Sequence, residues 1–487
     1  MSKVRSFGTE NQLLFDDALV EDKLGFTLTL NPPVKAETVA LTPERPWEAG
    51  GVHLASVVEG GDGIHRMYYG ATGEDGVRSL CYATSSDGVV WERPSLGIED
   101  SGGSRDNNLV MKGVWGSVFE DPNGAPAERY KLIGEDRTPW GVTSVNCGGA
   151  RFRYFKEDLE TWEYHSVMGA YSPDGIHWTK YPEPIMPWYT DTLNTAFWDE
   201  RIGRYVAYVR WNEHLHIDET GRQVGSFDYR TVARSESEDF ASFPEPIKVE
   251  EPDFTLVEDE DQVGGGLYNS AALNYSGAAD TYFILPSAYH HTSDTLDVQL
   301  ATSRDGIHFD RWLEPFFRLG ASGTFDAKGM YMGSGAIPAG DEIYLYYGGT
   351  DARHDIDVDV KRLANQKSGI GRLRLRRDGF VSQDVDRDEG WLTTVPFLME
   401  GDQLKVNMDA SSRGWLKVEI LDETGHTLWG FEKSVADRLM FNDLAQTVTW
   451  NGSSDVSSLR GRTVRLRFVG QWVKVFSFQF GENKDSH

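Results

Sequence analysis

The stretch Ala301–Phe309, ATSRDGIHF, is one of three near-identical copies of a polar turn set between two β-like runs. The other two copies are Tyr82–Trp91, YATSSDGVVW, and Ala170–Trp178, AYSPDGIHW, and degenerate copies stand at Val232–Phe240 and Leu373–Phe380. Because Asp-Gly pairs accept the positive φ of a tight hairpin turn, each copy predicts one β-hairpin whose aromatic residue packs back on it.

The spacing of the turn aspartates decides the fold class. The intervals are 87, 65, 66 and 73 residues, between Asp87, Asp174, Asp239, Asp305 and Asp378. A repeat of about 40 to 50 residues or more suits a four-stranded propeller blade and excludes a short solenoid repeat. A second hairpin pattern precedes each turn, starting at Val52, Gly116, Thr195, Ser270 and Ser334. The sequence therefore predicts an all-β protein with a five-bladed β-propeller.

The two ends of the propeller follow from the flanking sequence. The segments LLFDD (13–17) and FTLTLNPP (26–33) are expected to supply an outer strand that closes the ring. Beyond RDEGW (387–391) the short alternating runs continue without a further copy of the turn, which is typical of a β-sandwich. The predicted domains are a catalytic propeller at 1–388 and a C-terminal β-sandwich at 389–487, the latter mainly a packing partner.

Composition limits the partners. A net charge of −28 repels phosphate backbones and anionic lipid, so neither nucleic acid nor a membrane is an expected partner. Two cysteines make no disulfide framework, and the N-terminus lacks the apolar run of a signal peptide, which together predict a cytoplasmic protein. The fifteen Trp and twenty Tyr favour a carbohydrate ligand, because aromatic faces stack on the C–H surfaces of sugars.

Candidate catalytic residues follow from blade register. In a propeller, functional groups gather on the funnel face, just before each innermost strand and just after each second strand. Four acidic segments precede innermost strands, and they hold the catalytic candidates Glu48, Asp191 and Glu260 and the substrate-binding candidate Asp326. Converging carboxylates suit glycosidic cleavage, where one protonates the leaving oxygen and another attacks or activates water.

Candidate substrate-binding residues occupy the same predicted face. Arg210, His290 and His354 follow second strands, and His53 lies in the first blade. Arginine and histidine there can hydrogen-bond sugar hydroxyls or shift the pKa of a carboxylate. No spacing typical of a metal site occurs and no cofactor is expected, although the Asp- and His-rich run TDARHDIDVDV (350–360) is compatible with a structural Ca²⁺.

The layout resembles the five-bladed glycoside hydrolases of families 32, 43, 62 and 68, and most closely a group of bacterial family 32-like hydrolases. The shared elements are Pro-Trp-Glu (46–48), the Phe-Trp-Asp hairpin (197–199) and the Ser-x-Asp-Gly-x-x-Trp repeats. The resemblance implies Glu48 as base or nucleophile, Asp191 as the second carboxylate and Glu260 as the acid. The family 32 signatures Arg-Asp-Pro and Glu-Cys are absent, and Asp121 in EDPNG is expected to be a turn residue on the far face.

These observations predict an exo-acting glycosidase that cleaves a terminal sugar, furanosides included, from an oligosaccharide, with a neutral substrate expected from the acidic surface. Polysaccharide degradation is the corresponding process. Two alternatives remain open: a noncatalytic carbohydrate-binding propeller, and a sialidase- or lyase-type propeller enzyme. A sialidase needs an arginine cluster, of which Arg210 is the one obviously placed member, and a lyase would use His53, His290 and Tyr289.

Overall fold

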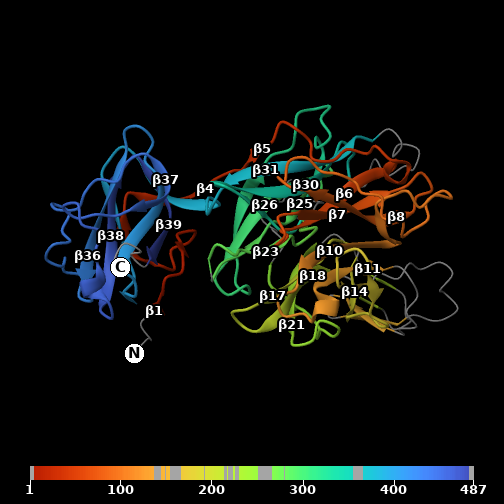
Figure 1. Cartoon of the computed structure of the whole chain (residues 1–487), viewed down its shortest axis with the longest axis horizontal. Helices are drawn as coiled ribbons and strands as arrows, with labels where there is room; N and C mark the ends of the chain where they lie inside the picture. The colour runs from red at the N-terminus through yellow and green to blue at the C-terminus, as the bar shows by residue number, and fades with distance from the viewer. Residues whose placement is uncertain are drawn as a thin grey trace. The chain divides into compact units, whose positions relative to one another are not determined.

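The computed structural model describes residues 5–136, 144–147, 150–153, 166–190, 192–212, 216–217, 223–224, 230–250, 266–278, 280–354 and 366–481. These residues form antiparallel β-sheets with almost no helix (Figure 1). The helices they contain are three short 3₁₀ turns, η1 (Pro46–Glu48), η2 (Pro126–Glu128) and η3 (Ser457–Leu459). None of the helices in the described part of the chain has the length and apolar character needed to cross a bilayer.

The chain forms two compact units. Unit 1 comprises residues 1–33, 275–281 and 375–487, and unit 2 comprises residues 34–274 and 282–374. These divisions lie at Pro33 and Leu375 in place of the single boundary expected near Asp388. The assignment of a catalytic domain to 1–388 and an accessory domain to 389–487 stays a prediction.

Unit 2 contains five groups of mainly antiparallel strands that follow one another along the chain, here called groups 1 to 5. Groups 4 and 5 form one ten-stranded sheet, joined by the parallel pairing of Leu296 with Gly329. Group 1 consists of β6 (Gly51–Val58), β7 (His65–Thr72), β8 (Arg78–Ser85) and β9 (Leu109–Lys112). Group 2 consists of β10 (Val114–Glu120), β11 (Tyr130–Asp136), β14 (Ser166–Ser172), β15 (Thr179–Lys180) and β16 (Met186–Tyr189), with β12 (Ser144–Cys147) and β13 (Ala150–Arg153) attached.

The remaining groups repeat this order. Group 3 consists of β17 (Thr195–Asp199), β18 (Arg204–Asn212), β21 (Arg230–Ser237) and β22 (Ile247–Lys248), and β19 (His216–Ile217) pairs with β20 (Gln223–Val224). Group 4 consists of β23 (Ala272–Asn274), β24 (Tyr282–Ile284), β25 (Ser287–His290), β26 (Thr295–Ser303) and β27 (Asp310–Phe317). Group 5 consists of β28 (Gly329–Met332), β29 (Ile337–Ala339), β30 (Glu342–Thr350), β31 (Ser368–Arg376) and β5 (Val34–Lys35).

The first strands of the five groups, or the residues next to them, are hydrogen-bonded in cyclic order. Group 1 contacts group 2, each later group contacts the next, and group 5 returns to group 1. The contacts are Val118 N to Ser56 Oγ (3.0 Å), Ser117 Oγ to Asn194 O (2.7 Å), Thr195 Oγ1 with Ser270 Oγ (3.0 Å), Asn269 Nδ2 to Met332 O (2.7 Å) and Val57 N to Ser334 O (2.9 Å). Small hydroxyl side chains dominate this list because they let neighbouring backbones approach closely.

The Asp-Gly turns have the predicted local chemistry. In the copy at Ser303, the backbone N–H of Gly306 donates to Ser303 Oγ (2.9 Å), and Asp305 Oδ1 accepts from the N–H groups of Ile307 and His308 (both 2.8 Å). Gly306 has φ +74°, which a side chain disfavours. The turn joins β26 to the antiparallel β27, so the predicted hairpin is confirmed.

Each well-formed turn packs on the group before it. The Tyr208 hydroxyl of group 3 donates to the carbonyl of Gly306 in group 4 (2.7 Å), and Tyr346 of group 5 bonds Gly88 of group 1 in the same way. The aromatic residue that ends the copy at Ser303 packs on the same tyrosine, because the ring centroids of Phe309 and Tyr208 lie 6.1 Å apart. The prediction that these aromatics pack back on their own hairpins is therefore incomplete, because their tyrosine partners belong to the preceding group.

Two expectations about the ends of unit 2 are wrong. The segment predicted to close the ring, FTLTL, is β4 (Phe26–Leu30) and pairs with β32 (Val381–Val385) inside unit 1. The strand that completes group 5 is β5, immediately downstream, which pairs with β31. For the same reason the copy at Asp378 is not a hairpin, since β31 and β32 on its two sides belong to different sheets.

Unit 1 contains two six-stranded sheets around one apolar core. The first sheet holds β1 (Arg5–Ser6), β34 (Phe397–Leu398), β38 (Thr463–Gln471), β33 (Gly390–Thr394), β3 (Val20–Leu24) and β36 (Trp415–Asp422). The second holds β37 (Asn442–Thr447), β35 (Gln403–Asp409), β39 (Val473–Gly481), β32, β4 and β2 (Gln12–Leu13). Alternate residues of both sheets, such as Leu404, Phe468 and Phe478, meet in the core.

Candidate active site

Side chains from groups 3, 4 and 5 meet at Tyr268, which lies just before β23 and is 7% exposed. The guanidinium carbons of Arg210 and Arg230 lie 4.5 and 4.4 Å from the centroid of its ring. The imidazole of His354, which follows β30, lies edge-on to the same ring at 4.3 Å. We call Arg210, Arg230, Tyr268, Tyr289, His291, Tyr331 and His354 the Tyr268 cluster.

Arg210 is held in place within this cluster. It ends the buried part of β18, is 2% exposed, and donates from Nε (3.2 Å) and Nη2 (2.7 Å) to the backbone carbonyl of Tyr268. Its own carbonyl accepts from the indole N–H of Trp188 (2.8 Å), three residues before Asp191 in the chain. Arg210 thus fixes the position of Tyr268 by charge-assisted bonds.

The second half of the cluster is built on Tyr289 of β25. Its ring lies 5.7 Å from Tyr268 and 4.5 Å from His291, and its hydroxyl donates to Asp294 Oδ1 (2.8 Å). The backbone N–H of His354 donates to the carbonyl of Asp294 (3.0 Å). Asp294 itself is buried and has φ +56°. Its side-chain bond to Tyr289 and its main-chain bond to His354 together hold the loop after β25.

His354 is oriented by Tyr331 of β28, whose hydroxyl lies 2.7 Å from His354 Nδ1. A tyrosine hydroxyl can donate to or accept from an imidazole nitrogen, so this contact fixes the orientation of the ring. His290 lies on the same strand as Tyr289, and its Nε2 is 3.1 Å from Asp297 Oδ2. Of the predicted substrate-binding residues, Arg210 and His354 are therefore brought together at Tyr268, and His290 lies next in sequence to the cluster residues Tyr289 and His291.

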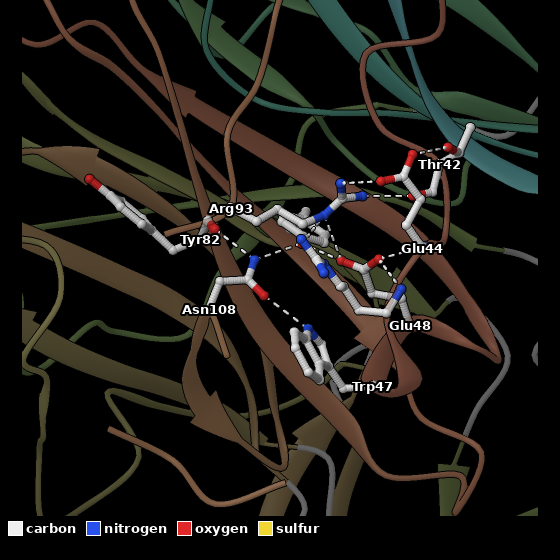
Figure 2. Close-up of polar contacts among 9 residues, drawn as sticks. Thr42, Glu44, Trp47, Glu48, Tyr82, Arg93 and Asn108 are labelled. Carbon is white, nitrogen blue, oxygen red and sulfur yellow. Dashed lines mark hydrogen bonds and ion pairs between the residues drawn. The ribbon is translucent and has the colours of Figure 1, made fainter. Parts of the chain in front are cut away.

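Glu48 lies in a closed buried network (Figure 2). It is 0% exposed at the end of η1, and its Oε1 accepts from the Tyr69 hydroxyl (2.6 Å) and from Arg93 Nε (2.9 Å). Its Oε2 accepts from the backbone N–H groups of Glu44 (2.9 Å) and Arg45 (3.2 Å). Both oxygens are engaged by the protein, which suits a structural carboxylate; the catalytic role of Glu48 stays a prediction.

The same network continues to the opposite side of Tyr69. Asn108 Nδ2 donates to the Tyr69 hydroxyl (2.8 Å). Asn108 Oδ1 accepts from the indole N–H of Trp47 (2.8 Å), as Figure 2 shows. Burial raises the pKa of Tyr69 well above its usual value, so its hydroxyl stays a donor to Glu48. The Pro-Trp-Glu element thereby fastens η1 to β7 and to the loop before β9.

Asp326 and His53 have separate surroundings. Asp326 is 3% exposed and accepts from Lys35 (2.5 Å), Tyr347 (2.8 Å) and Thr324 (2.7 Å). Burial raises its pKa, but these three bonds outweigh burial and the net shift is downward. Since Lys35 lies in β5, Asp326 ties the last strand of group 5 to the loop before β28; its substrate-binding role stays a prediction.

His53 of β6 lies edge-on to Trp115 at 4.4 Å, and the Arg78 guanidinium stacks 3.8 Å from the same indole. Burial and the charge of Arg78 lower the pKa of His53 to about 3, so the ring is neutral at pH 7. No interaction that the structure gives connects His53 to the Tyr268 cluster.

The remaining expectations fall partly beyond the described residues. Asp191, Glu260 and most of the run 350–360 proposed for Ca²⁺ lie outside them. Within the described ranges no group of three or more His, Cys, Asp or Glu side chains is placed to hold a metal ion. Asp121 is a turn residue between β10 and β11, as predicted, and its carboxylate accepts from the Tyr205 hydroxyl (2.8 Å).

Sequence reasoning missed two residues at the centre of the cluster, Arg230 and Tyr268. Arg230 opens the third strand of its group, a position that the loop rule for funnel residues does not cover. Tyr268 does precede an innermost strand, and the triple glycine at 264–266 before it was the available signal. The catalytic prediction considered only acidic residues at this position, so it did not include a tyrosine.

No protein-family model and no curated protein sequence matches this chain. Among solved structures, a glycosyl hydrolase from Bacteroides ovatus aligns with 71% of this chain and 94% of its own, at 14% identity and a TM-score of 0.43. An N-acetylgalactosamine deacetylase from F. plautii, in complex with blood group B trisaccharide, aligns with 77% of this chain and 95% of its own, at 15% identity and 0.41.

A third solved structure belongs to work on the GH130 family of mannoside phosphorylases, which contains glycoside hydrolases that target β-1,2 mannosidic linkages in Candida mannan. It aligns with 74% of this chain and 96% of its own, at 15% identity and a TM-score of 0.40. These neighbours are glycoside hydrolases and related carbohydrate enzymes. At such scores and identities they establish neither the fold nor the activity of this chain.

Proposed function

We propose that this protein is a glycoside hydrolase that removes a terminal sugar, furanosides included, from an oligosaccharide or glycoside. The observation that carries the proposal is the convergence of groups 3, 4 and 5 on Tyr268. Two guanidinium groups, a histidine and three tyrosines gather there, at the strand ends where a substrate site is expected. Such a combination suits a sugar, because the polar side chains can hydrogen-bond its hydroxyl groups and the aromatic rings can stack on its C–H face.

We infer that unit 2 is a five-bladed β-propeller and unit 1 a β-sandwich. The cyclic bonds between first strands, with group 5 returning to group 1 through Val57 N and Ser334 O (2.9 Å), support the propeller. Two sheets sharing one core support the sandwich. A propeller funnel closed at its base admits a chain end more readily than a chain middle, which is the ground for exo action.

In this mechanism the two carboxylates are Asp191 and Glu260. Glu260 protonates the leaving glycosidic oxygen, and Asp191 attacks the anomeric carbon or activates water. Both positions are close in sequence to residues of the cluster. Trp188, which bonds Arg210, precedes Asp191 by three residues, and Glu260 precedes Tyr268 by eight.

A panel of aryl glycosides and plant or algal oligosaccharides tests the activity, with Asp191→Asn and Glu260→Gln as variants. Each variant is expected to lower kcat by about 10² to 10⁴, the range of general acid–base catalysis. Asp62→Asn, an exposed turn carboxylate paired with Arg66, is the matched control and keeps full activity. Binding of a sugar without turnover by the unchanged protein would instead establish the alternative, a carbohydrate-binding propeller.

A further inference from the structure

Arg230 has no counter-ion among the described residues of this acidic protein. Among the described residues it donates no hydrogen bond and forms no ion pair, and its Nε is buried with no acceptor. Its stacking on Tyr268, at 4.4 Å, is the interaction that positions it. The chain carries 76 acidic against 48 basic residues, so an arginine without a carboxylate partner is not explained by a shortage of carboxylates.

Among the described residues His291 shows a related feature beside Tyr289. Its Nε2 is buried and has no hydrogen-bond partner, while its ring packs on Tyr289 at 4.5 Å. Since Tyr289 lies 5.7 Å from Tyr268, the contacts run without a break from Arg230 through the two tyrosines to His291. A buried polar atom left without a hydrogen-bond partner is destabilising, so two in one cluster require an explanation.

Two carboxylates of this region have partners other than Arg230, although the buried Asp297 Oδ1 has no hydrogen-bond partner among the described residues. Asp294 Oδ1 accepts from the Tyr289 hydroxyl (2.8 Å), and Asp297 Oδ2 lies against His290 (3.1 Å). Arg210, the second guanidinium on Tyr268, is turned to the Tyr268 carbonyl. Among the described residues the buried Nε of Arg230 therefore has no acceptor.

We propose that Arg230, with His291 as second donor, binds the carboxylate of an acidic sugar, so that the substrate is a uronic-acid glycoside. This rests on the proposed glycosidase function and names its substrate class. A guanidinium offers a planar fork of N–H donors that fits a carboxylate, and the Tyr268 ring stiffens that fork before the ligand arrives. The net charge of the chain led to the expectation of a neutral substrate. The proposal differs because it places a locally basic site within an acidic surface.

The test is equilibrium binding to the full-length protein, measured by calorimetry with matched ligand pairs. Methyl glucuronide is compared with methyl glucoside, and methyl galacturonide with methyl galactoside, since the members of each pair differ only at C6. One uronide is expected to bind at least about tenfold more tightly than its neutral partner, which corresponds to about 1.4 kcal/mol. Added salt is expected to weaken the binding of the uronide and to leave the binding of the neutral sugar unchanged.

The variants are Arg230→Gln, Arg230→Lys and His291→Gln, each checked for folding by thermal unfolding. Arg230→Gln abolishes the preference for the uronide, Arg230→Lys keeps part of it, and His291→Gln weakens it. Arg129→Gln, an exposed arginine paired with Glu120 at the β10–β11 turn, is the control and keeps the full preference. If Arg230→Gln fails to fold, the lysine and histidine variants carry the test.

Equal binding of both members of every pair, or binding of neither, overturns the proposal. So does a uronide preference that survives Arg230→Gln, or displacement by inorganic sulfate as effective as by the uronide. The calorimetry measures binding and not turnover, so it is independent of the activity panel. A protein that binds uronides but cleaves none of the glycosides in that panel refutes the hydrolase function alone. A protein that cleaves neutral glycosides without preferring uronides refutes the acidic-sugar site alone.

Discussion

Glu48 Oε1 lies 2.6 Å from the hydroxyl of Tyr69, and the same oxygen accepts from Arg93 Nε at 2.9 Å. The carboxylate is 0% exposed, whereas the Arg93 side chain is 8% exposed. A buried charge pair of this kind is costly to break, because removal of one partner leaves the other charged and desolvated. A structural role for Glu48 therefore predicts that its substitution lowers the stability of the protein, which a purely catalytic role does not.

Glu48→Gln is expected to lower the free energy of unfolding by about 3 kcal/mol, because the uncharged amide leaves Arg93 without its buried partner and brings N–H groups against donors. Chemical denaturation measures this. The matched control is Glu44→Gln, since Glu44 pairs with the same arginine (3.3 Å) but is 61% exposed, and its loss should cost less than about 1 kcal/mol. A Glu48→Gln protein that is fully stable but inactive would establish the catalytic role instead.

Two glycines with the same backbone conformation isolate the contact between neighbouring groups. Gly306 (φ +74°) and Gly203 (φ +62°) both disfavour a side chain, but a Cβ at Gly306 would lie 2.8 Å from the Tyr208 hydroxyl, whereas one at Gly203 meets nothing within 4 Å. Gly203→Ala should cost about 1 kcal/mol from backbone strain. Gly306→Ala should cost about 1 to 3 kcal/mol more, from displacement of Tyr208. Equal losses in denaturant titrations would show that the turn does not dock on group 3.

The pKa of His53, lowered to about 3 by burial and Arg78, gives the protein a predictable pH dependence. Below pH 6.5 the unfolded chain binds a proton at this residue and the folded chain does not, so stability falls as pH falls from about 6.5 toward 3. The slope from this group is at most about 1.4 kcal/mol per pH unit. His53→Gln should remove that slope between pH 6 and about 4, while His177→Gln, at a 70% exposed turn position, should leave it in place. Identical slopes in the unchanged protein and His53→Gln would contradict the shift.

What the sequence predicts well is local. The Asp-Gly turns are recognisable because Ser303, Asp305 and Gly306 satisfy one another within four residues, with no need for the rest of the chain. Blade register then places Arg210 and His354 on one face, and both reach Tyr268. The ends of a strand can be located from its middle because a strand has a period of two and a known direction. The substrate-binding roles of Arg210 and His354 stay predictions.

What the sequence does not predict depends on distant partners. The alternation of FTLTL is the same whether the strand joins group 5 or pairs with Val381–Val385, and only the competing strand Val34–Lys35 decides between them. Likewise Glu48 looks like a loop carboxylate until Arg93, 45 residues on, is seen to cover it. Arg230 was overlooked because its importance comes from stacking on Tyr268, 38 residues away in sequence.

Truncation tests the shared core of unit 1. Deletion of residues 389–487 removes β33 to β39, and with them the strand partners of β2 and β3, while β4 keeps its pairing with β32. The core side chains Leu14, Leu19 and Phe26 are left uncovered. These three side chains are at most 3% exposed, and exposed apolar surface of this kind drives aggregation. The shortened chain is expected to be insoluble on expression. Removal of residues 1–33 together with 375–487 takes away both sides of the core, so this chain should be the more soluble of the two, as size-exclusion chromatography would show. A soluble, monomeric chain ending at 388 would mean that the N-terminal strands do not need the C-terminal ones.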